Sequence, residues 1–163
     1  MKKLFFTLLL IVILSTCKTK FDPLWAFPEI PDLGLQTTQD VMLWVACYIT
    51  YQSDTIHYPA NEYWQSPAQT YVWGCGDCED FTILAMYLLH RDVGLEPRMV
   101  RGTWGGRSHA WVLAGGNWWE PQEGITVTDN PDYVKKNTLS YEEVMERATT
   151  SHRAIVIDQG EEK

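Results

Sequence analysis

The stretch GCGDCED, residues 74–80, places a cysteine, Cys78, among carboxylates. The reactive form of a cysteine is the thiolate, and neighbouring negative charges oppose its formation. Asp77 is a suitable helix N-cap, so Cys78 falls in a first helical turn. Unpaired N–H groups and a partial positive charge there favour a thiolate and supply a donor for an oxyanion. Because an adjacent imidazolium would outweigh the carboxylates, Cys78 is a candidate nucleophile that requires a histidine partner.

His109 is the candidate for that partner. It opens the apolar segment HAWVLA just after a glycine-containing turn, where its ring could reach a neighbouring helix terminus. The other three histidines have simpler interpretations, because His57 lies in a polar loop, His90 at a helix end and His152 in the C-terminal stretch. The sequence thus offers one candidate general base, with a purely structural histidine as the alternative.

Glu120 is the candidate for a third member that orients the imidazole. A two-residue glycine turn at 115–116 would pair Ala114 with Asn117. Counting outward from that pair, His109 and Glu120 project from one face of the hairpin on a diagonal, roughly 7 Å apart before side-chain reach is added. A shift of the turn by one residue would send the two groups to opposite faces. A solvated strand-end carboxylate is therefore the alternative for Glu120.

Two helices are predicted to precede the histidine. The first covers residues 37–54, begins at a threonine able to cap it, and is followed by a polar, proline-marked loop over residues 57–76. The second begins at Asp77, where Asp80 completes a capping box, and ends at Gly94. The first helix is indicated by apolar residues at helical spacing, namely Val41, Trp44, Val45, Tyr48 and Ile49.

After Gly94 the apolar pattern alternates, which is typical of strands. Ser140 with Glu143 then opens a last short helix. The order predicts one α+β domain in which helices pack on an antiparallel sheet. The predicted strands are residues 96–104, 109–114, 117–121 and 153–157.

Three segments together resemble a known family: GDCEDFTILAMYLLH, VRGTW and HAWVLAGGNWWEP. They are similar to the transglutaminase-like superfamily of papain-like cysteine enzymes, and nearest to the bacterial transglutaminase-like cysteine proteinases, which share a W-x-x-P element before GDCED. The resemblance covers about residues 63–121 and implies a papain-like core. It also implies that Cys78 is the nucleophile, His109 the general base and acid, and Glu120 the orienting acid, at a position where the family pattern has aspartate.

The same chemistry needs an oxyanion hole and a substrate groove. The hole would use the Cys78 backbone N–H and one further donor, for which Gln52, Gln69 and Trp73 are candidates that the sequence does not separate. Five tryptophans could wall a groove around the cysteine, although strand alternation means that some must belong to the core. They are Trp73, Trp104, Trp111, Trp118 and Trp119.

The resemblance raises calcium as a cofactor, because some members of the proteinase subgroup bind it through acidic residues beside the nucleophile. The corresponding residues are Asp77, Glu79 and Asp80. A cation there would offset their repulsion of a thiolate. However, first-turn carboxylates stabilise a helix by about 0.3–1 kcal/mol each without metal, and three neighbours do not fill the roughly six to eight ligand positions of calcium. We therefore expect no cofactor, with calcium as the alternative.

The remaining cysteines suggest an oxidised pair rather than a metal site. Cys75 and Cys78 form a single CxxC without a second pair, which disfavours zinc. We expect Cys75 to pair with Cys47 or to be a buried thiol, since a bond to Cys78 would block activity. A redox protein is the alternative, and it predicts that Cys75→Ser abolishes function, whereas a hydrolase survives that change.

The N-terminus has the pattern of an export signal, with two lysines, a short apolar run and the sequence LSTC. LSTC resembles a bacterial lipobox, although Thr16 departs from the usual small residue before the cysteine. We expect a signal peptide over residues 1–17 with lipidation at Cys17, a tether over residues 18–36, and the transglutaminase-like domain over residues 37–163. Ordinary secretory cleavage is the alternative to a lipid-anchored protein in the bacterial cell envelope.

The net negative charge of the chain disfavours some classes of binding partner. The chain carries a formal charge of −8, and loss of Lys2 and Lys3 with the signal makes the remainder more acidic, which disfavours nucleic acid. We expect a protein or peptide substrate, a membrane contact only through the lipid anchor, and hydrolysis of a peptide or isopeptide amide through a thioester. The alternatives are a non-catalytic transglutaminase-like binding module and a cross-linking transglutaminase. The sequence does not specify the oligomeric state.

Overall fold

The structure is a computed structural model of the 163-residue chain and describes residues 27–54 and 63–160, with side chains through Ser151. The predicted signal peptide, the predicted lipidation site Cys17 and His57 lie outside the described residues. The described elements follow in chain order: α1 (Thr38–Tyr48), β1 (Thr50–Tyr51), α2 (Pro67–Trp73), β2 (Cys75–Gly76), α3 (Cys78–Leu88), the π-helix η2 (Leu89–Val93), β3 (Arg98–Trp104), β4 (Arg107–Ala114), β5 (Asn117–Glu120), β6 (Ile125–Thr126), β7 (Tyr133–Leu139) and α4 (Tyr141–Gly160).

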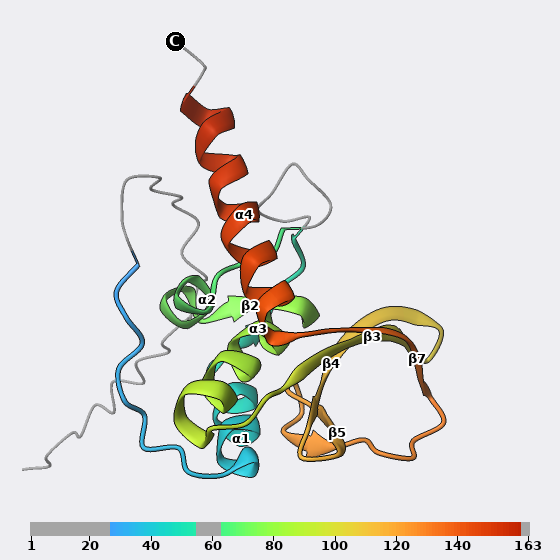
Figure 1. Cartoon of the computed structure of the whole chain (residues 1–163). Coiled ribbons are helices and arrows are strands. Elements are labelled where there is room, and N and C mark those ends of the chain that lie inside the picture. Colours follow the sequence, from blue (N-terminus) through green and yellow to red (C-terminus); the bar gives the residue numbers. More distant parts are fainter. Residues whose placement is uncertain (1–26, 55–62, 161–163) are drawn as a thin grey trace, which may run out of the picture.

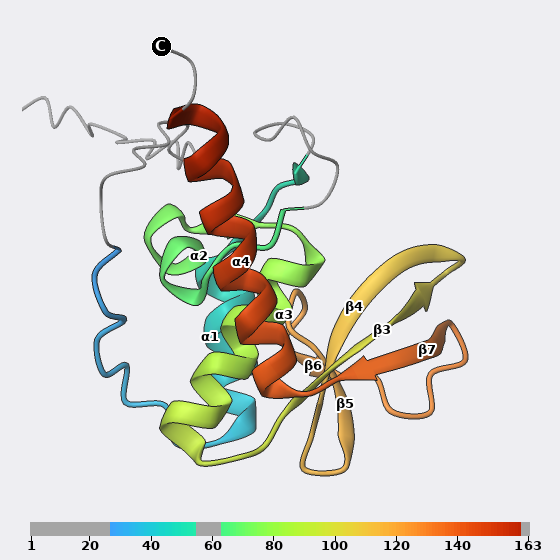
Figure 2. The same cartoon turned by 45° about the horizontal axis from the view of Figure 1, so that its top comes forward.

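Helices and sheet form two sides of the molecule. The four α-helices gather on one side, and the sheet extends from the other, with α4 lying across the helical side (Figures 1 and 2). The sheet has five strands in the order β6-β5-β4-β3-β7, with antiparallel neighbours. This arrangement confirms the predicted α+β class, in which helices pack on an antiparallel sheet.

The first helix, α1, starts where the sequence predicts but ends earlier. Thr37 caps it and forms a capping box with Asp40. The helix ends at Tyr48, so the prediction of helix to residue 54 was wrong. The chain turns extended at Ile49, and the β-branched and aromatic residues after it suit a strand. Thr50 then pairs in parallel with Cys75, which ties the end of α1 to the segment leading into Cys78.

The predicted loop over residues 57–76 contains a helix, α2, that the prediction missed. Ser66 caps it, Pro67 occupies its first turn, and Gln69 completes a capping box. Gly74 ends it in the left-handed conformation, at φ 66°. These are ordinary helix signals, and the prolines and polar residues around them concealed a helix of only seven residues.

Helix α3 confirms the predicted start at Cys78. The Asp77 side chain caps it, and the Asp80 carboxylate in turn accepts a hydrogen bond from the Asp77 backbone N–H. The helix passes into the π-turn η2, which Gly94 ends in the left-handed conformation at φ 73°. Most residues of α3 are buried in the main core. They include Phe81, Ile83, Leu84, Ala85, Met86 and Leu88.

The sheet registers agree with the hairpin prediction. Ala114 pairs with Asn117, as predicted for a turn at residues 115–116. The strand β7 was not predicted, because its sequence YVKKNTL alternates poorly and most of its middle is exposed. It pairs with β3 through a register shift between Arg101 and Gly102. A side chain at position 102 would come within 2.0 Å of the Val134 carbonyl oxygen, so glycine permits this close approach.

The C-terminal helix α4 begins with a capping box between Ser140 and Glu143, as predicted. It then continues to Gly160, so the strand predicted over residues 153–157 was wrong. Val144 and Ala148 bury one face of its first half against the core, and continuation of that helix replaces a strand that would lack a neighbour. Among the described helices, none combines the length and hydropathy that crossing a bilayer demands.

Part of the predicted tether packs on the domain. Ile30 is 6% exposed and joins the main core, while Leu33 and Leu35 pack against it. Arg91, in η2, donates to the Ile30 carbonyl oxygen at 2.7 Å. The described residues 27–36 are therefore attached along the helical side, where Figure 1 shows them beside α1.

Candidate active site

Cys78 is positioned by the segment that caps α3. The Asp80 carboxylate accepts from the backbone N–H groups of Asp77 at 3.2 Å and Gln65 at 2.8 Å, and is fully buried. A side chain at Gly76 would come within 2.6 Å of that carboxylate, so the glycine makes room for the cap. The tight turn fixes Cys78 at the first residue of the helix.

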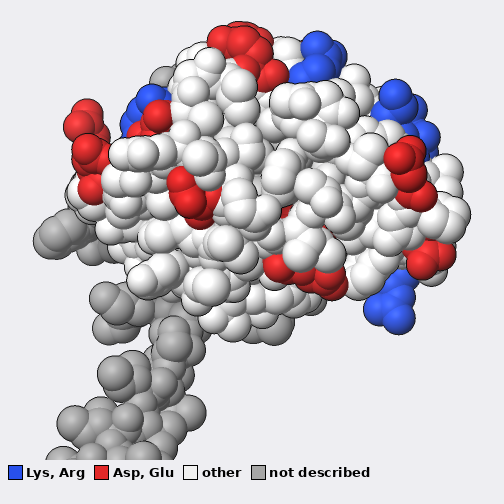
Figure 3. Space-filling model, turned by 90° about the horizontal axis from the view of Figure 1, so that it is seen from below, with Lys and Arg blue, Asp and Glu red and all other residues white. Residues whose placement is uncertain are grey.

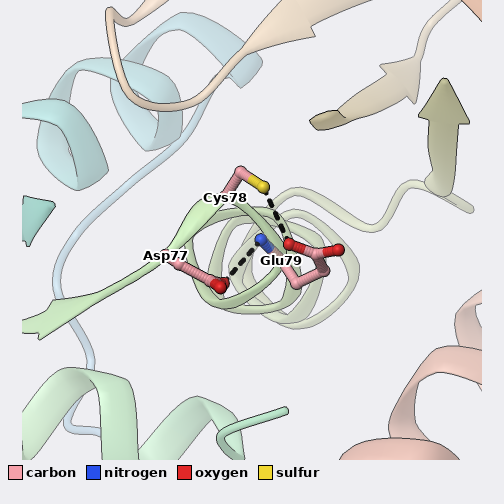
Figure 4. Close-up of side chains that lie close together, drawn as sticks. All are labelled: Asp77, Cys78 and Glu79. Carbon is pink, nitrogen blue, oxygen red and sulfur yellow. Dashed lines mark hydrogen bonds between the residues drawn. The ribbon is translucent and has the colours of Figure 1, made fainter. Parts of the chain in front are cut away.

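The Cys78 sulfur faces a carboxylate of its own turn. Its S–H donates to Glu79 Oε2 at 2.7 Å (Figure 4). The pKa of the thiol is raised well above its ordinary value, first by burial, then by the charge and hydrogen bond of Glu79 and the charge of Asp77. The backbone N–H of Ala110 opposes this shift. The first-turn position alone therefore does not lower the pKa of this thiol.

His109 and Glu120 form a buried pair, as the hairpin register predicts. His109 Nε2 lies 2.6 Å from Glu120 Oε2, and the side chains are 7% and 2% exposed. The Tyr133 hydroxyl also donates to this oxygen, at 3.1 Å. Since Oε2 is an acceptor, the ring proton is assigned to Nε2. The Nδ1 atom is then the nitrogen that can accept a proton.

The pair and the sulfur belong to neighbouring parts of the fold. Ala110, whose N–H faces the sulfur, directly follows His109 on β4, and α3 packs against β4 through the main core. Within the described residues, the hydrogen-bond partner of the sulfur is Glu79 rather than the imidazole. The structure thus brings the three predicted residues to one junction between helix and sheet, with the thiol turned toward Glu79.

Carboxylates form a second cluster beside the nucleophile. Carboxylate oxygens of Asp54, Asp77 and Asp80 lie within 4.8 Å of one another, and so do the ligand atoms of Asp77, Cys78 and Glu79. Burial, followed by the charges of Glu79 and Asp54, raises the pKa of Asp77 to about 8. Burial and the charge of Asp77 also raise the pKa of Asp80. Sequence reasoning missed Asp54, because it lies 23 residues before Asp77 in the sequence.

The profile of the Transglutaminase-like superfamily matches residues 29–120. The chain belongs to this superfamily. The match spans the candidate nucleophile, the histidine and Glu120, and it begins within the segment that packs along α1. No curated protein matches this transglutaminase-like chain significantly.

Solved structures similar to this transglutaminase-like protein include LapG from Legionella pneumophila. The calcium-bound form aligns with TM-score 0.53 at 22% identity, covering 63% of this chain and 62% of that one. The EGTA-treated form gives TM-score 0.52 at 22% identity, covering 63% and 61%. A further LapG structure gives 0.51 at 18% identity, covering 75% and 76%. This chain thus spans about three fifths of the length of the first two, and the likeness shows a shared transglutaminase-like, papain-like fold.

The three oxyanion candidates differ in their surroundings. Gln69 is buried. Its Oε1 accepts from the Ser66 N–H, and its Nε2 donates to the Tyr63 hydroxyl, each at 2.7 Å. Trp73 packs edge-on against Phe27. The backbone N–H of Gln52 donates to the Gly76 carbonyl oxygen at 2.7 Å. Gln52 is therefore the candidate whose backbone is tied to the segment entering Cys78.

The tryptophans divide between core and site. Trp111 is fully buried, and Trp119 packs against the main core, with its indole N–H donating to the Ala114 carbonyl oxygen. Trp118 packs edge-on against Trp111. Trp104 is 42% exposed, and its ring centroid lies 5.5 Å from that of His109. Of the predicted groove residues, Trp104 is the one that combines exposure with contact to the candidate site.

The cysteine pairing differs from the prediction. Cys75 is disulfide-bonded, whereas Cys47 and Cys78 are free thiols. Both expectations for Cys75, a bond to Cys47 and a buried free thiol, were therefore wrong, since Cys47 is itself a free thiol on α1 and Cys75 is bonded. The CxxC bond that would block the nucleophile is not formed either, and Cys75 is not available as a resolving thiol for Cys78.

Proposed function

We propose that this protein is a cysteine peptidase that hydrolyses peptide or isopeptide amide bonds through a thioester on Cys78. One observation carries the proposal. The buried His109–Glu120 pair lies on the hairpin whose Ala110 amide faces the Cys78 sulfur. A nucleophile at a helix start, a base beside it and an acid that orients the base are the parts that such acyl transfer needs.

His109 acts as base and acid in turn. Glu120 and Tyr133 keep its proton at Nε2, so Nδ1 takes the thiol proton as the sulfur attacks the carbonyl carbon. The C–N bond then breaks, and Nδ1 gives the proton to the leaving amine. Water attacks the thioester and loses a proton to Nδ1. The C–S bond breaks, the acid leaves, and the sulfur recovers its proton.

The oxyanion of each tetrahedral intermediate is stabilised by backbone and side-chain donors. The Cys78 N–H lies in the first turn of α3, where N–H groups lack a partner within the helix. Gln52 supplies the second donor in this proposal, because β1 holds its backbone against Gly76.

Two exposed aromatic side chains mark where a peptide substrate would lie. Trp104 stacks near His109, and Tyr51 is 57% exposed on β1. Burial and then the charges of Cys78, Asp77, Glu79 and Asp54 raise the pKa of Tyr51, which places its hydroxyl near the nucleophile. An extended peptide between the two rings would present its carbonyl to the sulfur.

Alkylation kinetics test the peptidase proposal. We expect iodoacetamide to modify Cys78 with a pH-dependent rate that His109→Ala lowers by at least about 100-fold, because the thiol then lacks its base. His90→Ala is the matched control, since His90 stacks on Tyr141 away from the site, and it should leave the rate unchanged. A rate indifferent to His109→Ala would contradict the proposal.

The second candidate is a non-catalytic binding module of the same fold, and one observation favours it. Cys78 donates to Glu79, and the pKa of its thiol is raised. Such a module would show the slow, His109-independent alkylation described above. A cross-linking transglutaminase is distinguished by incorporation of a primary amine into a peptide substrate, whereas the hydrolase transfers the acyl group to water.

We also propose that calcium binds at the carboxylates beside Cys78. Asp54, Asp77 and Asp80 converge, and Asp77 has its pKa raised to about 8, so a cation would relieve their mutual repulsion. Glu79 adds a carboxylate on the sulfur side. Calcium would supply positive charge that favours a thiolate. One of the similar structures is calcium-bound LapG, which supports the proposal.

Metal removal tests the calcium proposal. We expect the midpoint of thermal unfolding to rise when calcium is added to EGTA-treated protein and to fall again in excess EGTA, because an ion that binds the folded state stabilises it. Asp77→Asn should abolish most of this response, whereas Asp129→Asn, a loop carboxylate away from the cluster, should retain it. An equal response in both variants would contradict the assignment.

The cellular location is also a proposal. We propose export and lipidation at Cys17, which excludes a disulfide between Cys75 and that residue, with attachment to the bacterial envelope and a protein or peptide as partner rather than nucleic acid. On the face seen in Figure 3, acidic and basic groups lie scattered with uncharged surface between them, which supports a non-nucleic-acid partner. Membrane fractionation of Cys17→Ser tests the anchor, since that variant should move to the soluble fraction.

A further inference from the structure

Tyr133 contacts the candidate acid rather than the nucleophile. Its hydroxyl donates to Glu120 Oε2 at 3.1 Å, the same oxygen that accepts from His109 Nε2. The other carboxylate oxygen, Oε1, accepts from the Gln122 N–H at 3.0 Å. Glu120 is thus held by three donors in a site where it is 2% exposed.

The fold carries Tyr133 to this point from the far edge of the sheet. Tyr133 begins β7, whereas Glu120 ends β5, and β3 and β4 lie between these strands. The register shift at Gly102 and the absence of a side chain there let β7 approach closely. The Tyr133 ring is 5% exposed and packs edge-on against Trp111, with centroids 5.3 Å apart.

The same ring also borders the imidazole. The Tyr133 and His109 centroids lie 6.0 Å apart in an edge arrangement, and Trp104 stacks on Tyr133 at 5.8 Å. The ring and the hydroxyl therefore restrain both members of the pair. A glutamate side chain has three rotatable bonds and loses much freedom when fixed, so each donor that anchors it also fixes the imidazole.

We propose that Tyr133 is a positioning residue that holds Glu120 in the orientation at which it fixes the His109 ring and tautomer. This inference rests on the proposed peptidase function. The hydroxyl also shares the negative charge of Oε2 with the imidazole N–H. Removal of the hydroxyl leaves that charge directed at His109 alone, where it stabilises the positive charge of a ring that has taken up the thiol proton.

The titratable groups that face Tyr133, Glu120 and His109 are carboxylates and the Cys78 thiol. Glu123 and Asp132 are the further carboxylates whose charge reaches the Tyr133 hydroxyl, in addition to Glu120. The Cys78 thiol faces the adjacent Ala110 amide from α3. Because these neighbours remain in a Tyr133→Phe variant, a change in pH dependence reports the loss of the hydroxyl.

The test is the pH profile of Cys78 alkylation by iodoacetamide in the full chain. For Tyr133→Phe we expect the maximal rate to fall at least about 10-fold, since a displaced base loses its alignment, and the limb on which the rate rises with pH to move to higher pH. Tyr141→Phe is the matched control: it removes the same atom from a ring that stacks on His90, and its profile should follow the wild type.

A double-mutant cycle separates positioning from general destabilisation. In a Glu120→Gln background, Tyr133→Phe should change the rate less than about 2-fold, because the hydroxyl then has no carboxylate to hold. Independent effects of the two changes would overturn the inference. An unchanged profile in Tyr133→Phe, with a His109-dependent wild type, would overturn it while leaving the peptidase proposal intact. A wild type without His109 dependence would overturn both.

If Tyr133→Phe does not fold, difluorotyrosine at position 133 gives the second measurement. Fluorine makes the hydroxyl a stronger donor without removing it, so the limb on which the rate rises with pH should move to lower pH, opposite to the phenylalanine variant. The same replacement at Tyr141 is the control and should leave the limb in place. A limb that stays fixed with difluorotyrosine at position 133 would overturn the inference.

Discussion

The Cys78 S–H donates to Glu79 Oε2, and this contact opposes formation of the thiolate. A helix start favours a thiolate by the partial positive charge of its N–H groups. Here, burial and two neighbouring carboxylates exceed that effect, and the pKa of the thiol is raised. The reactivity of Cys78 then depends on a base that removes the thiol proton, on a cation that binds the Glu79 carboxylate in place of the thiol, or on both.

Asp77 makes the stability of the metal-free protein depend on pH. Its pKa is raised from an ordinary 3.8 to about 8, so between these values the folded chain keeps a proton that the unfolded chain has lost. The free energy of unfolding should therefore fall as pH rises through this window, by up to about 1.4 kcal/mol per pH unit for one group. Urea unfolding in EGTA at several pH values measures this slope.

Asp77→Asn is the decisive variant for that slope. Asparagine does not titrate, and its side-chain oxygen can still cap α3 by accepting from the Glu79 N–H. We expect a shallower slope than in the wild type, with the remainder due to Asp80, whose pKa is also raised. A slope equal to that of the wild type would show that Asp77 is ionised in the folded protein.

At the scale of elements, the approach of β7 to β3 depends on Gly102. An added methyl group would lie 2.0 Å from the Val134 carbonyl oxygen and 2.8 Å from the Trp111 ring. Backbone must shift to relieve this overlap, so Gly102→Ala should lower the free energy of unfolding by about 1–3 kcal/mol, as overpacking does. It should also draw Tyr133 from Glu120 and move the alkylation profile in the direction expected for Tyr133→Phe.

Thr103→Ala is the control for the glycine variant. Thr103 is the next residue on β3, is partly exposed, and pairs with Ser108 and Val134. Loss of its side chain removes little packing, and its free energy of unfolding, measured in urea, should stay within about 0.5 kcal/mol of the wild type. Equal destabilisation of the two variants would argue against a close approach at Gly102.

The starts of α1, α3 and α4 were predictable, whereas α2, the ends of α1 and α4, and the strands β1, β2, β6 and β7 were not. Asp77 with Asp80, and Ser140 with Glu143, are local signals that act within one turn. The strand β7 depends on partners far along the chain, and a bulge at Gly102 carries no recognisable sequence pattern. The helix at residues 153–157 shows the converse, because an apolar run alone does not separate helix from strand.

At the scale of the whole molecule, the fold brings together residues that the sequence could identify one by one. Cys78 is identified by a cap, and His109 and Glu120 by the register of one hairpin, which the structure confirms through the Ala114 and Asn117 pair. Tyr133 and Asp54 could not be identified in this way. Both reach the site only through tertiary packing, one across the sheet and one across the segment before α3.

The order of strands along the chain also bears on when the candidate site is complete during synthesis. A nascent polypeptide leaves the ribosome from its N-terminus, so the thiol, the imidazole and the carboxylate emerge before β7 does. The phenol that anchors the carboxylate arrives last, and it arrives on an edge strand. A chain caught part-way through synthesis would therefore carry the three candidate residues before the phenol that holds Glu120 is in place.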